Sequence, residues 1–261
     1  MRTFAMANQK GGVGKTTFTY FLAWALVMLG YRVLVVDIDP QGNVSRSLTH
    51  ELEPDQLGLA DVLSEETDIV IGDALVPGLW GGLVILPTPV RAALRVVGEE
   101  LTIARAGTRE RRLSAALEEV ADDFDVCLID CPPALNQLTV NALVASDDVV
   151  IVTEPGMYAV DGLGEQLEAI DEVRAYYQPD LQVAGILVNL YDPRTIRGKH
   201  WLNEIVEYAT ANNLRVLEPV IHKRVVIADA AEAESTLADF GEPELANVYL
   251  EHGKNLMNGA A

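Results

Sequence analysis

Short apolar runs alternate with longer amphipathic stretches along the whole of this 261-residue chain. Residues 33–36 and 149–152 are apolar at every position, which is typical of strands covered on both faces, as in a parallel sheet. The longer stretches carry their apolar residues at helical spacing. This alternation predicts an α/β fold, with a single doubly wound, mostly parallel sheet that has helices on both faces. Ligands of such folds bind at the carboxyl ends of the strands.

The pattern places each element by its residue range. We expect strands at residues 3–7, 32–37, 83–86, 126–130, 148–153, 182–190 and 215–217. We expect helices at residues 15–29, 59–63, 109–121, 138–145, 163–177, 199–212 and 242–257, and a loop at 78–82. No repeat or linker interrupts the alternation, so we expect one domain over residues 1–261.

A glycine-rich loop follows the first predicted strand and opens the first predicted helix. Glycines allow the backbone to curl tightly around a phosphate, and the helix start directs free N–H groups at that anion. Lys15 has the length to reach the β- and γ-phosphates of a nucleotide, and the Thr16 hydroxyl can complete a Mg²⁺ shell. The pattern predicts that ATP and Mg²⁺ bind this loop, which consists of Lys10, Gly11, Gly12, Val13, Gly14, Lys15, Thr16 and Thr17.

Two apolar strands end in carboxylates. Asp37 and Asp39 follow residues 33–36, and they share one face if the strand continues. Beside a phosphate loop, one of them can hold a Mg²⁺-bound water while the other orients the attacking water. Asp130 ends the strand at 126–130 in the form of a Walker B motif, so we expect it to bind Mg²⁺ through water.

The loop departs from the usual G-x-x-x-x-G-K-[ST] pattern, because Gln9 replaces the first glycine and Lys10 is an additional cation. In this respect the chain resembles the deviant Walker A class of P-loop NTPases, in particular the ParA/Soj/MinD family of partition and positioning ATPases. Two further motifs carry the resemblance, Asp-x-Asp-Pro-Gln-Gly-Asn at 37–43 and Asp-x-Pro-Pro at 130–133. The short N-terminus resembles the small, chromosomal-type branch.

The resemblance implies a role for each residue. Lys10 would reach across an ATP-dependent sandwich dimer to the partner's phosphates, where a second cation stabilises charge that develops on the transferring oxygens. Asp39 would position the attacking water, and Asp37 would support the metal region. Asn189 would contact the adenine, and Pro219 would form a wall of the pocket that holds the base. ATP hydrolysis would be slow and stimulated by a partner protein.

ParA-like proteins bind non-specific DNA as ATP dimers, through basic residues in the last third of the chain. Phosphate contacts require only Lys or Arg. Such a protein would segregate plasmid, chromosome or other cargo with a ParB-like or other adaptor; the sequence does not name the cargo. The chain departs from the family at 227–234, where an acidic run stands. The DNA-binding candidates are Arg194, Arg197, Lys199, Lys223 and Arg224.

The charge of the chain restricts where DNA can bind. The formal net charge is −20, the pI is about 4.4, and only five residues are lysines. A salt-loving host and a genome that favours Arg codons both explain this composition. This charge argues against a broad nucleic-acid surface, so any DNA contact requires a local basic patch. No apolar run reaches the roughly 18 residues of a membrane span, and no signal peptide pattern is present. We therefore expect a cytoplasmic, nucleoid-associated protein without stable membrane association.

Two other functions fit the same fold. A MinD-like membrane-cycling ATPase requires a basic amphipathic C-terminal helix, whereas residues 251–261 contain one lysine. An iron–sulfur carrier requires exposed cysteines, whereas Cys127 lies in a predicted strand and Cys131 just beyond it. We expect two buried thiols rather than a disulfide, and a metal or iron–sulfur site shared across a dimer is the alternative. The histidines, expected at the surface, are His50, His200, His222 and His252.

Overall fold

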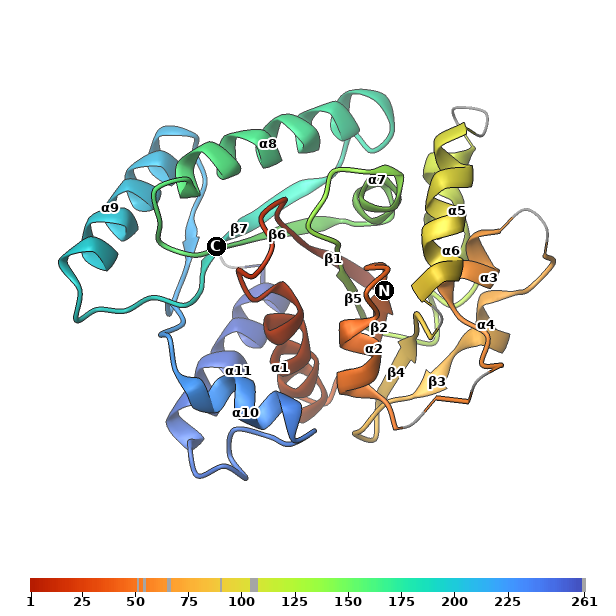
Figure 1. Cartoon of the computed structure of the whole chain (residues 1–261), viewed down its shortest axis with the longest axis horizontal. Helices are drawn as coiled ribbons and strands as arrows, with labels where there is room; N and C mark the ends of the chain where they lie inside the picture. The colour runs from red at the N-terminus through yellow and green to blue at the C-terminus, as the bar shows by residue number, and fades with distance from the viewer. Residues whose placement is uncertain (51, 54, 65–66, 90, 104–107, 260–261) are drawn as a thin grey trace.

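The chain folds around one eight-stranded sheet, in the order β3-β4-β2-β5-β1-β6-β7-β8 (Figure 1). The computed structural model describes residues 1–259 except 51, 54, 65–66, 90 and 104–107. Within these residues every strand pairing is parallel except that of β3 with β4. The strands are β1 (Arg2–Ala7), β2 (Val33–Asp37), β3 (Val76–Pro77), β4 (Leu83–Leu86), β5 (Val126–Asp130), β6 (Asp148–Thr153), β7 (Gln182–Val188) and β8 (Val216–Leu217).

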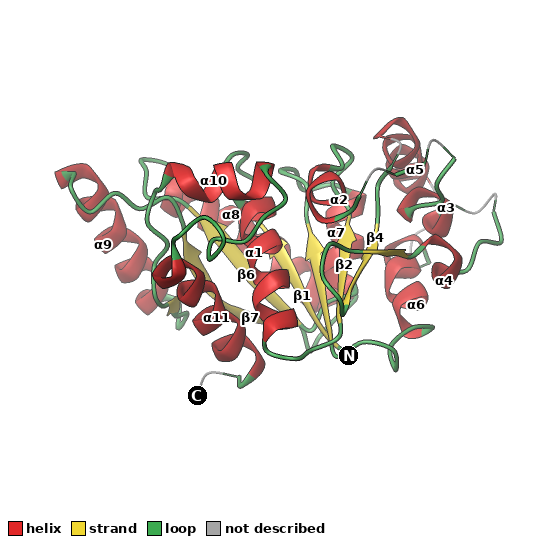
Figure 2. Ribbon diagram, turned by 90° about the horizontal axis from the view of Figure 1, so that it is seen from below, coloured by secondary structure: helices red, strands yellow, loops and turns green. Residues whose placement is uncertain are grey.

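Helices cover both faces of the sheet, as Figure 2 shows with α1 and α11 in front of the strands and α8 behind them. None of the helices in the described residues has the length and hydropathy to cross a bilayer. The helices are α1 (Lys15–Met28), α2 (Asn43–Leu48), α3 (Leu59–Leu63), α4 (Ile71–Ala74), α5 (Arg91–Ile103), the 3₁₀ turn η1 (Arg109–Arg111), α6 (Arg112–Glu118), α7 (Gln137–Val144), α8 (Ala159–Tyr176), α9 (Ile196–Ala211), α10 (Val225–Glu232) and α11 (Pro243–Met257).

Each face of the sheet has its own hydrophobic core, because successive strand residues point to opposite sides. Leu34 and Ile129 pack with α7, α8 and the helices near the β4 edge. Val35 and Leu128 pack instead with α1, α2, α10 and α11. Burial of the central strands on both faces explains why β1, β2, β5 and β6 each contain four consecutive apolar residues. The predicted doubly wound α/β fold is confirmed.

The predicted strands begin and end within two residues of the observed ones, whereas some helix predictions were less accurate. Helix α8 begins four residues earlier than expected and α9 three residues earlier. The Thr195 side chain explains the start of α9, since it accepts the backbone N–H of Gly198 as an N-cap. The predicted helix at 109–121 is a 3₁₀ turn followed by α6, which ends at Glu118. Four helices and one short strand were not predicted: α2, α4, α5, α10 and β3.

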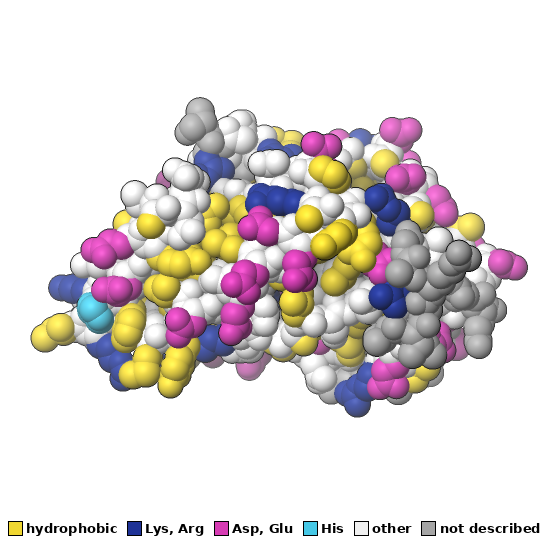
Figure 3. Space-filling view, turned by 90° about the horizontal axis from the view of Figure 1, so that it is seen from above, with side chains coloured by type: hydrophobic (Ala, Val, Ile, Leu, Met, Phe, Trp, Pro, Cys, Tyr) yellow, Lys and Arg dark blue, Asp and Glu magenta, His cyan; other side chains and the backbone are white. Residues whose placement is uncertain are grey.

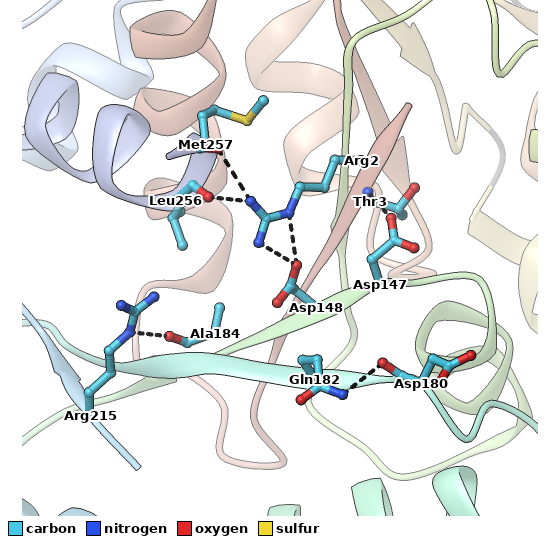
Figure 4. A network of polar contacts seen from close by, with 10 residues as sticks. All are labelled: Arg2, Thr3, Asp147, Asp148, Asp180, Gln182, Ala184, Arg215, Leu256 and Met257. Carbon is cyan, nitrogen blue, oxygen red and sulfur yellow. Dashed lines mark hydrogen bonds and ion pairs between the residues drawn. The ribbon is translucent and has the colours of Figure 1, made fainter. Parts of the chain in front are cut away.

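Arg2 connects the start of the first strand to the end of the last helix (Figure 4). Its guanidinium donates two hydrogen bonds to Asp148 Oδ2, at 2.9 and 2.7 Å, and one to the backbone oxygen of Leu256, at 2.7 Å. A cation near the last turn of a helix satisfies carbonyls that have no partner within the helix. Arg2 therefore fixes the C-terminal end of α11 against β1 and β6.

His252 is buried, which corrects the expectation that all four histidines lie at the surface. It is 1% exposed on the face of α11 that packs against α1, with its ring at 85° to that of Phe18. Its Nε2 atom lies 2.9 Å from the backbone oxygen of Pro219. Burial lowers the pKa of His252 to about 4, and the hydrogen bond to Pro219 opposes that shift. The neutral imidazole thus donates its Nε2–H to the Pro219 carbonyl in the loop that follows β8.

His252→Gln should reduce the loss of stability in acid. A neutral buried histidine gains its proton only on unfolding, so its contribution is complete above about pH 6.5 and disappears as the pH falls toward 4. Between pH 7 and 5 the wild type should lose about 2 kcal/mol more than the variant. Urea unfolding at both pH values measures this difference. His222→Gln, at an exposed position, should behave as the wild type; equal pH slopes for all three proteins would contradict the assignment.

Candidate active site

The nominated residues of the glycine-rich loop and the nominated carboxylates meet at the carboxyl edge of three adjacent strands. Strand β5 lies between β1, which leads into the glycine-rich loop, and β2, which leads into Asp37 and Asp39. Asp130 is in register with Met6 on one side and with Asp37 on the other. Because these strands are parallel, the loop and the carboxylates lie at one edge of the sheet.

The glycine-rich loop has a backbone that only glycine adopts without strain. Gly12 and Gly14 have φ angles of 79° and 86°, in the left-handed region that disfavours other residues. A Cβ at Gly14 would also overlap the side-chain nitrogen of Asn189. In the described part of the chain no side chain caps the N-terminus of α1, so its first N–H groups are available to an anion.

The two lysines of this loop point to different surroundings. Lys15 is 7% exposed, and its Nζ donates to the backbone oxygens of Asn8 and Lys10, at 3.0 and 3.4 Å. Burial lowers the pKa of Lys15, although Asp130 opposes that shift. Lys10 Nζ instead lies at the surface, where it forms an ion pair of 2.7 Å with Glu154 Oε1. Lys15 therefore faces the loop interior, and Lys10 does not.

Asp130 joins the end of β5 to the first turn of α1. Its Oδ2 accepts a hydrogen bond of 2.7 Å from Thr16 Oγ1, and its Oδ1 accepts one of 3.1 Å from Thr19 Oγ1. The carboxylate is fully buried, and burial raises its pKa to about 6 while these hydroxyls and Lys15 oppose the shift. A hydroxyl and a buried carboxylate that meet beside a phosphate loop are oxygen ligands of the kind that Mg²⁺ takes, so Thr16 and Asp130 could hold the ion together with nucleotide phosphates.

Asp37 already has protein partners on its carboxylate. Oδ2 accepts hydrogen bonds from the Ser45 N–H at 2.8 Å and the Ser45 hydroxyl at 2.6 Å. Asp37 is fully buried, and burial and the nearby Asp130 raise its pKa to about 8, although the Ser45 hydrogen bonds oppose the shift. Asp39 is 7% exposed, and its Oδ1 accepts the Gln41 N–H at 2.9 Å. The roles expected of Asp37 in metal support and of Asp39 in water positioning stay predictions.

These residues fit a nucleotide with Mg²⁺. Gly11, Gly12, Val13 and Gly14 form the loop, Lys15 is directed into it, and Thr16 and Asp130 are in contact. Bound Mg²⁺ would supply neutralisation of charge on the phosphate oxygens. With the nucleotide bound, the loop and Lys15 would contact the phosphates. The full burial of Asp37 and Asp130 excludes bulk solvent from these carboxylates.

Asn189 contacts the glycine-rich loop directly. Its Nδ2 donates to the backbone oxygen of Val13 at 3.0 Å, and its Oδ1 accepts the Leu190 N–H at 2.8 Å. Backbone hydrogen bonds of Tyr191 N–H to Ile221 O and of Ile221 N–H to Val188 O place the loop after β8 beside it. Pro219 belongs to that loop and lines a pocket of about 260 Å³ between it and α11. Contact of Asn189 and Pro219 with a base stays a prediction.

The basic residues nominated for DNA come from two segments that the fold joins. Tyr191 and His222 form a parallel β-bridge, so the segment of Arg194 lies beside that of Lys223. Arg194 pairs with Asp192 at 2.9 Å, and Arg224 pairs with Glu242 at 2.6 Å. Within the residues that the structure describes, three of the nominated residues have no ion-pair partner, namely Arg197, Lys199 and Lys223. Figure 3 shows basic side chains beside apolar ones at the end of the molecule that carries α9.

Sequence reasoning missed Glu154, the partner of Lys10. The signal was present, because Glu154 comes two positions after the apolar run 149–152, at the carboxyl end of β6, much as Asp37 and Asp130 follow the apolar runs of β2 and β5. Asn8 and Thr19 were also missed. The Asn8 side chain donates to Val152 O and accepts the Lys10 N–H, both in contacts that only the folded loop creates.

Cys127 and Cys131 are buried and free, as expected. Burial raises the pKa of both thiols, so neither is a ready thiolate. Within the described residues no group of three or more His, Cys, Asp or Glu side chains is placed to hold a metal.

A parallel sheet with a glycine-rich loop, an inward lysine and a Walker B carboxylate defines a P-loop ATPase. The family described as the AAA domain matches residues 1–183. The chain is 36% identical over 229 residues to the sporulation initiation inhibitor protein Soj of Bacillus subtilis, which covers 88% of this chain and 87% of Soj. It is also 36% identical over 240 residues to the chromosome partitioning protein ParA of Caulobacter vibrioides, with 88% of each covered. The chain belongs to the ParA/Soj family of partition ATPases.

A solved structure agrees with this assignment in fold and ligands. The chain is similar to a structure described as cobyrinic acid a,c-diamide synthase from Mycobacterium smegmatis, with bound ADP and magnesium, at a TM-score of 0.82 and 35% identity. The similarity covers 98% of this chain and 94% of that one. The same protein has been solved with an ATP analogue and magnesium.

Thr16→Ala should weaken the Mg²⁺-dependent part of nucleotide binding. The variant loses the hydroxyl that meets Asp130, so ATP affinity in Mg²⁺ should fall by about tenfold or more, equivalent to about 1.4 kcal/mol, whereas affinity in EDTA should change little. Fluorescent ATP titrations in Mg²⁺ and in EDTA measure both. Thr16→Ser should keep wild-type affinity. An equal loss with and without Mg²⁺ would show that Thr16 does not act through the metal.

Proposed function

We propose that this chain is a ParA-type partition or positioning ATPase. It binds ATP and Mg²⁺, forms an ATP-dependent sandwich dimer, and binds DNA non-specifically to segregate plasmid, chromosome or other cargo on the nucleoid. It hydrolyses ATP to ADP and phosphate slowly, and a ParB-like or other adaptor protein stimulates it. Asp39 orients the attacking water, while Lys15 and Lys10 of the second copy stabilise charge on the phosphate oxygens.

The observation that carries this proposal is the position of Lys10. Lys15 already places its ammonium group inside the loop, where it donates to the backbone oxygen of Asn8, so a second lysine is not required there. The Lys10 side chain is 41% exposed, and its contact with Glu154 is a surface ion pair, which is a weak interaction in water. Exchange of this pair for the phosphates of a second copy would therefore cost little.

Apolar side chains support a second copy at the same edge. Leu135, which follows the two prolines after β5, is 44% exposed. Met157 and Tyr158, just beyond Glu154, are 54% and 67% exposed. Large exposed apolar groups of this kind are a feature of protein interfaces. Met157 and Tyr158 follow Glu154 closely in the chain, and Leu135 follows the strand end at Asp130, so these groups favour a partner that covers the nucleotide edge.

A local basic surface supports DNA binding despite the net charge of −20. Arg197, Lys199 and Lys223 lie on the two segments that the Tyr191–His222 bridge joins. Non-specific binding requires cations that can exchange solvent for phosphates. The acidic residues at 229–234 lie largely on α10 rather than within these two segments.

Two other functions lose support from the structure. A MinD-like membrane cycle requires a free amphipathic C-terminal helix, but α11 buries Leu245, Tyr249 and Leu256 against the core that contains α1.

Amide transfer, suggested by the description of the Mycobacterium smegmatis protein, commonly requires a thiolate nucleophile. Both cysteines of this chain are at most 1% exposed.

DNA co-sedimentation should depend on ATP and on Lys10. The wild type should pellet with DNA in ATP but not in ADP, and Lys10→Ala should lose this binding while fluorescent-ATP titrations show that it still binds nucleotide. Lys254→Ala, which removes an exposed lysine at the far end of α11, should pellet as the wild type does. DNA binding that is absent at every salt concentration would refute the proposal, and vesicle flotation would then test a membrane matrix.

Lys223→Ala should reduce the salt dependence of DNA binding. Each phosphate contact that is lost lowers the slope of log affinity against log salt by about 1. Arg32→Ala removes one cation at the amino edge of the sheet, where Arg32 pairs with Asp125, and should leave the slope unchanged. Affinity measured by fluorescence anisotropy from low to high salt gives both slopes. Equal slopes for Lys223→Ala and the wild type would remove Lys223 from the DNA surface.

A further inference from the structure

One buried carboxylate holds both ends of the segment that carries Asp39. Asp37 Oδ1 accepts the backbone N–H of Asp39 at 3.3 Å, where the segment begins. Asp37 Oδ2 accepts the N–H and the hydroxyl of Ser45, at 2.8 and 2.6 Å, where the segment has become helix α2. Residues 39–45 therefore form a loop whose two ends meet at a single side chain.

Thr88, which follows β4, closes this cluster from the neighbouring strand. Its backbone N–H donates to Ser45 Oγ at 2.8 Å, and its hydroxyl donates to the backbone oxygen of Asp37 at 2.6 Å. A Cβ at Gly42, whose φ is 63°, would lie 2.6 Å from the Thr88 carbonyl oxygen. The turn between Asp39 and Ser45 thus packs directly against Thr88.

The cluster is dry. Asp37 and Ser45 are 0% exposed, and Thr88 is 3% exposed. Hydrogen bonds between buried polar groups hold geometry well, because a lost partner leaves an unsatisfied group without water to replace it. The Ser45 hydroxyl is central, since it donates to Asp37 and accepts from Thr88.

We propose that Ser45 and Thr88 are positioning residues for ATP hydrolysis, which hold Asp37 and, through it, the segment that presents Asp39 to the attacking water. The proposal rests on the ATPase function proposed above. It assigns Asp37 to the support of this loop. Displacement of a catalytic group by about 1 Å can reduce a rate by about 100-fold, so a loop held at both ends is a requirement for turnover rather than for nucleotide binding.

Three substitutions and one control test the cluster. Ser45→Ala removes the central hydroxyl, and Thr88→Val removes a hydroxyl while it preserves the shape of the side chain. Thr88→Ser keeps the hydroxyl and removes only a methyl group. Ser47→Ala is the matched control, because Ser47 lies on the same helix and its hydroxyl bonds only to Asn43 O near the surface.

Ser45→Ala should lower kcat at saturating ATP by about tenfold or more, which corresponds to about 1.4 kcal/mol, with the Kd for ATP unchanged within about twofold. Thr88→Val should lower kcat in the same way, and Thr88→Ser should retain wild-type turnover. In the ATP-free proteins, hydrogen exchange of the amides at 39–45 should accelerate in Ser45→Ala and Thr88→Val but not in Ser47→Ala.

Wild-type turnover in folded Ser45→Ala and Thr88→Val would overturn the proposal. So would losses of kcat and of ATP affinity that match the loss of folded protein. If Ser45→Ala does not fold, the comparison of Thr88→Val with Thr88→Ser decides alone. Failure of the ATPase function is distinct from these outcomes, since the wild type itself would then hydrolyse no ATP.

Discussion

The Asp130 carboxylate sits where the sheet, the glycine-rich loop and the predicted metal position meet. A carboxylate in a fully buried environment is expensive unless hydrogen bonds satisfy it. Thr16 and Thr19 satisfy it from the first turn of α1, so the same interaction fixes the helix start to the central strand. Asp37, in register with Asp130 on the next strand, then has Ser45 as its own partner. The geometry at the ends of β5 and β2 therefore follows from the hydrogen bonds that satisfy these two adjacent buried carboxylates.

Most of the sheet could be predicted, because β1, β2, β5 and β6 each contain four consecutive apolar residues with polar residues on both sides of the run. The P-loop residues could be nominated because Gly-Lys-Thr at a helix start has a direct physical purpose. Helix α5 also had a readable signal that was overlooked, since Leu94, Val97 and Leu101 share one helical face and all three are buried.

Other features depend on tertiary contacts that spacing does not encode. Helix α2 has six residues, too few for stability by local propensity, and the Ser45 N–H at its first turn bonds to Asp37. Thr88 joins this cluster from 51 residues away. In the sequence, His252 is one polar residue near the end of a helix. Only the packing of α11 on α1 shows that it is buried. Glu154 meets Lys10 across 144 positions of the chain, so its place beside an apolar run did not reveal its partner.

The link between Arg2 and Leu256 spans 254 positions of the chain. Contacts between residues so far apart in sequence form late in folding, because a long loop of chain must first be closed at a cost in conformational entropy. During synthesis the phosphate loop is made well before the helix that supplies His252 to the Pro219 loop. A nascent chain that already has its central strands would thus have its glycine-rich loop before the Pro219 loop, which is predicted to contact the base, is held in place. Competence for complete nucleotide recognition would therefore be acquired only when α11 docks.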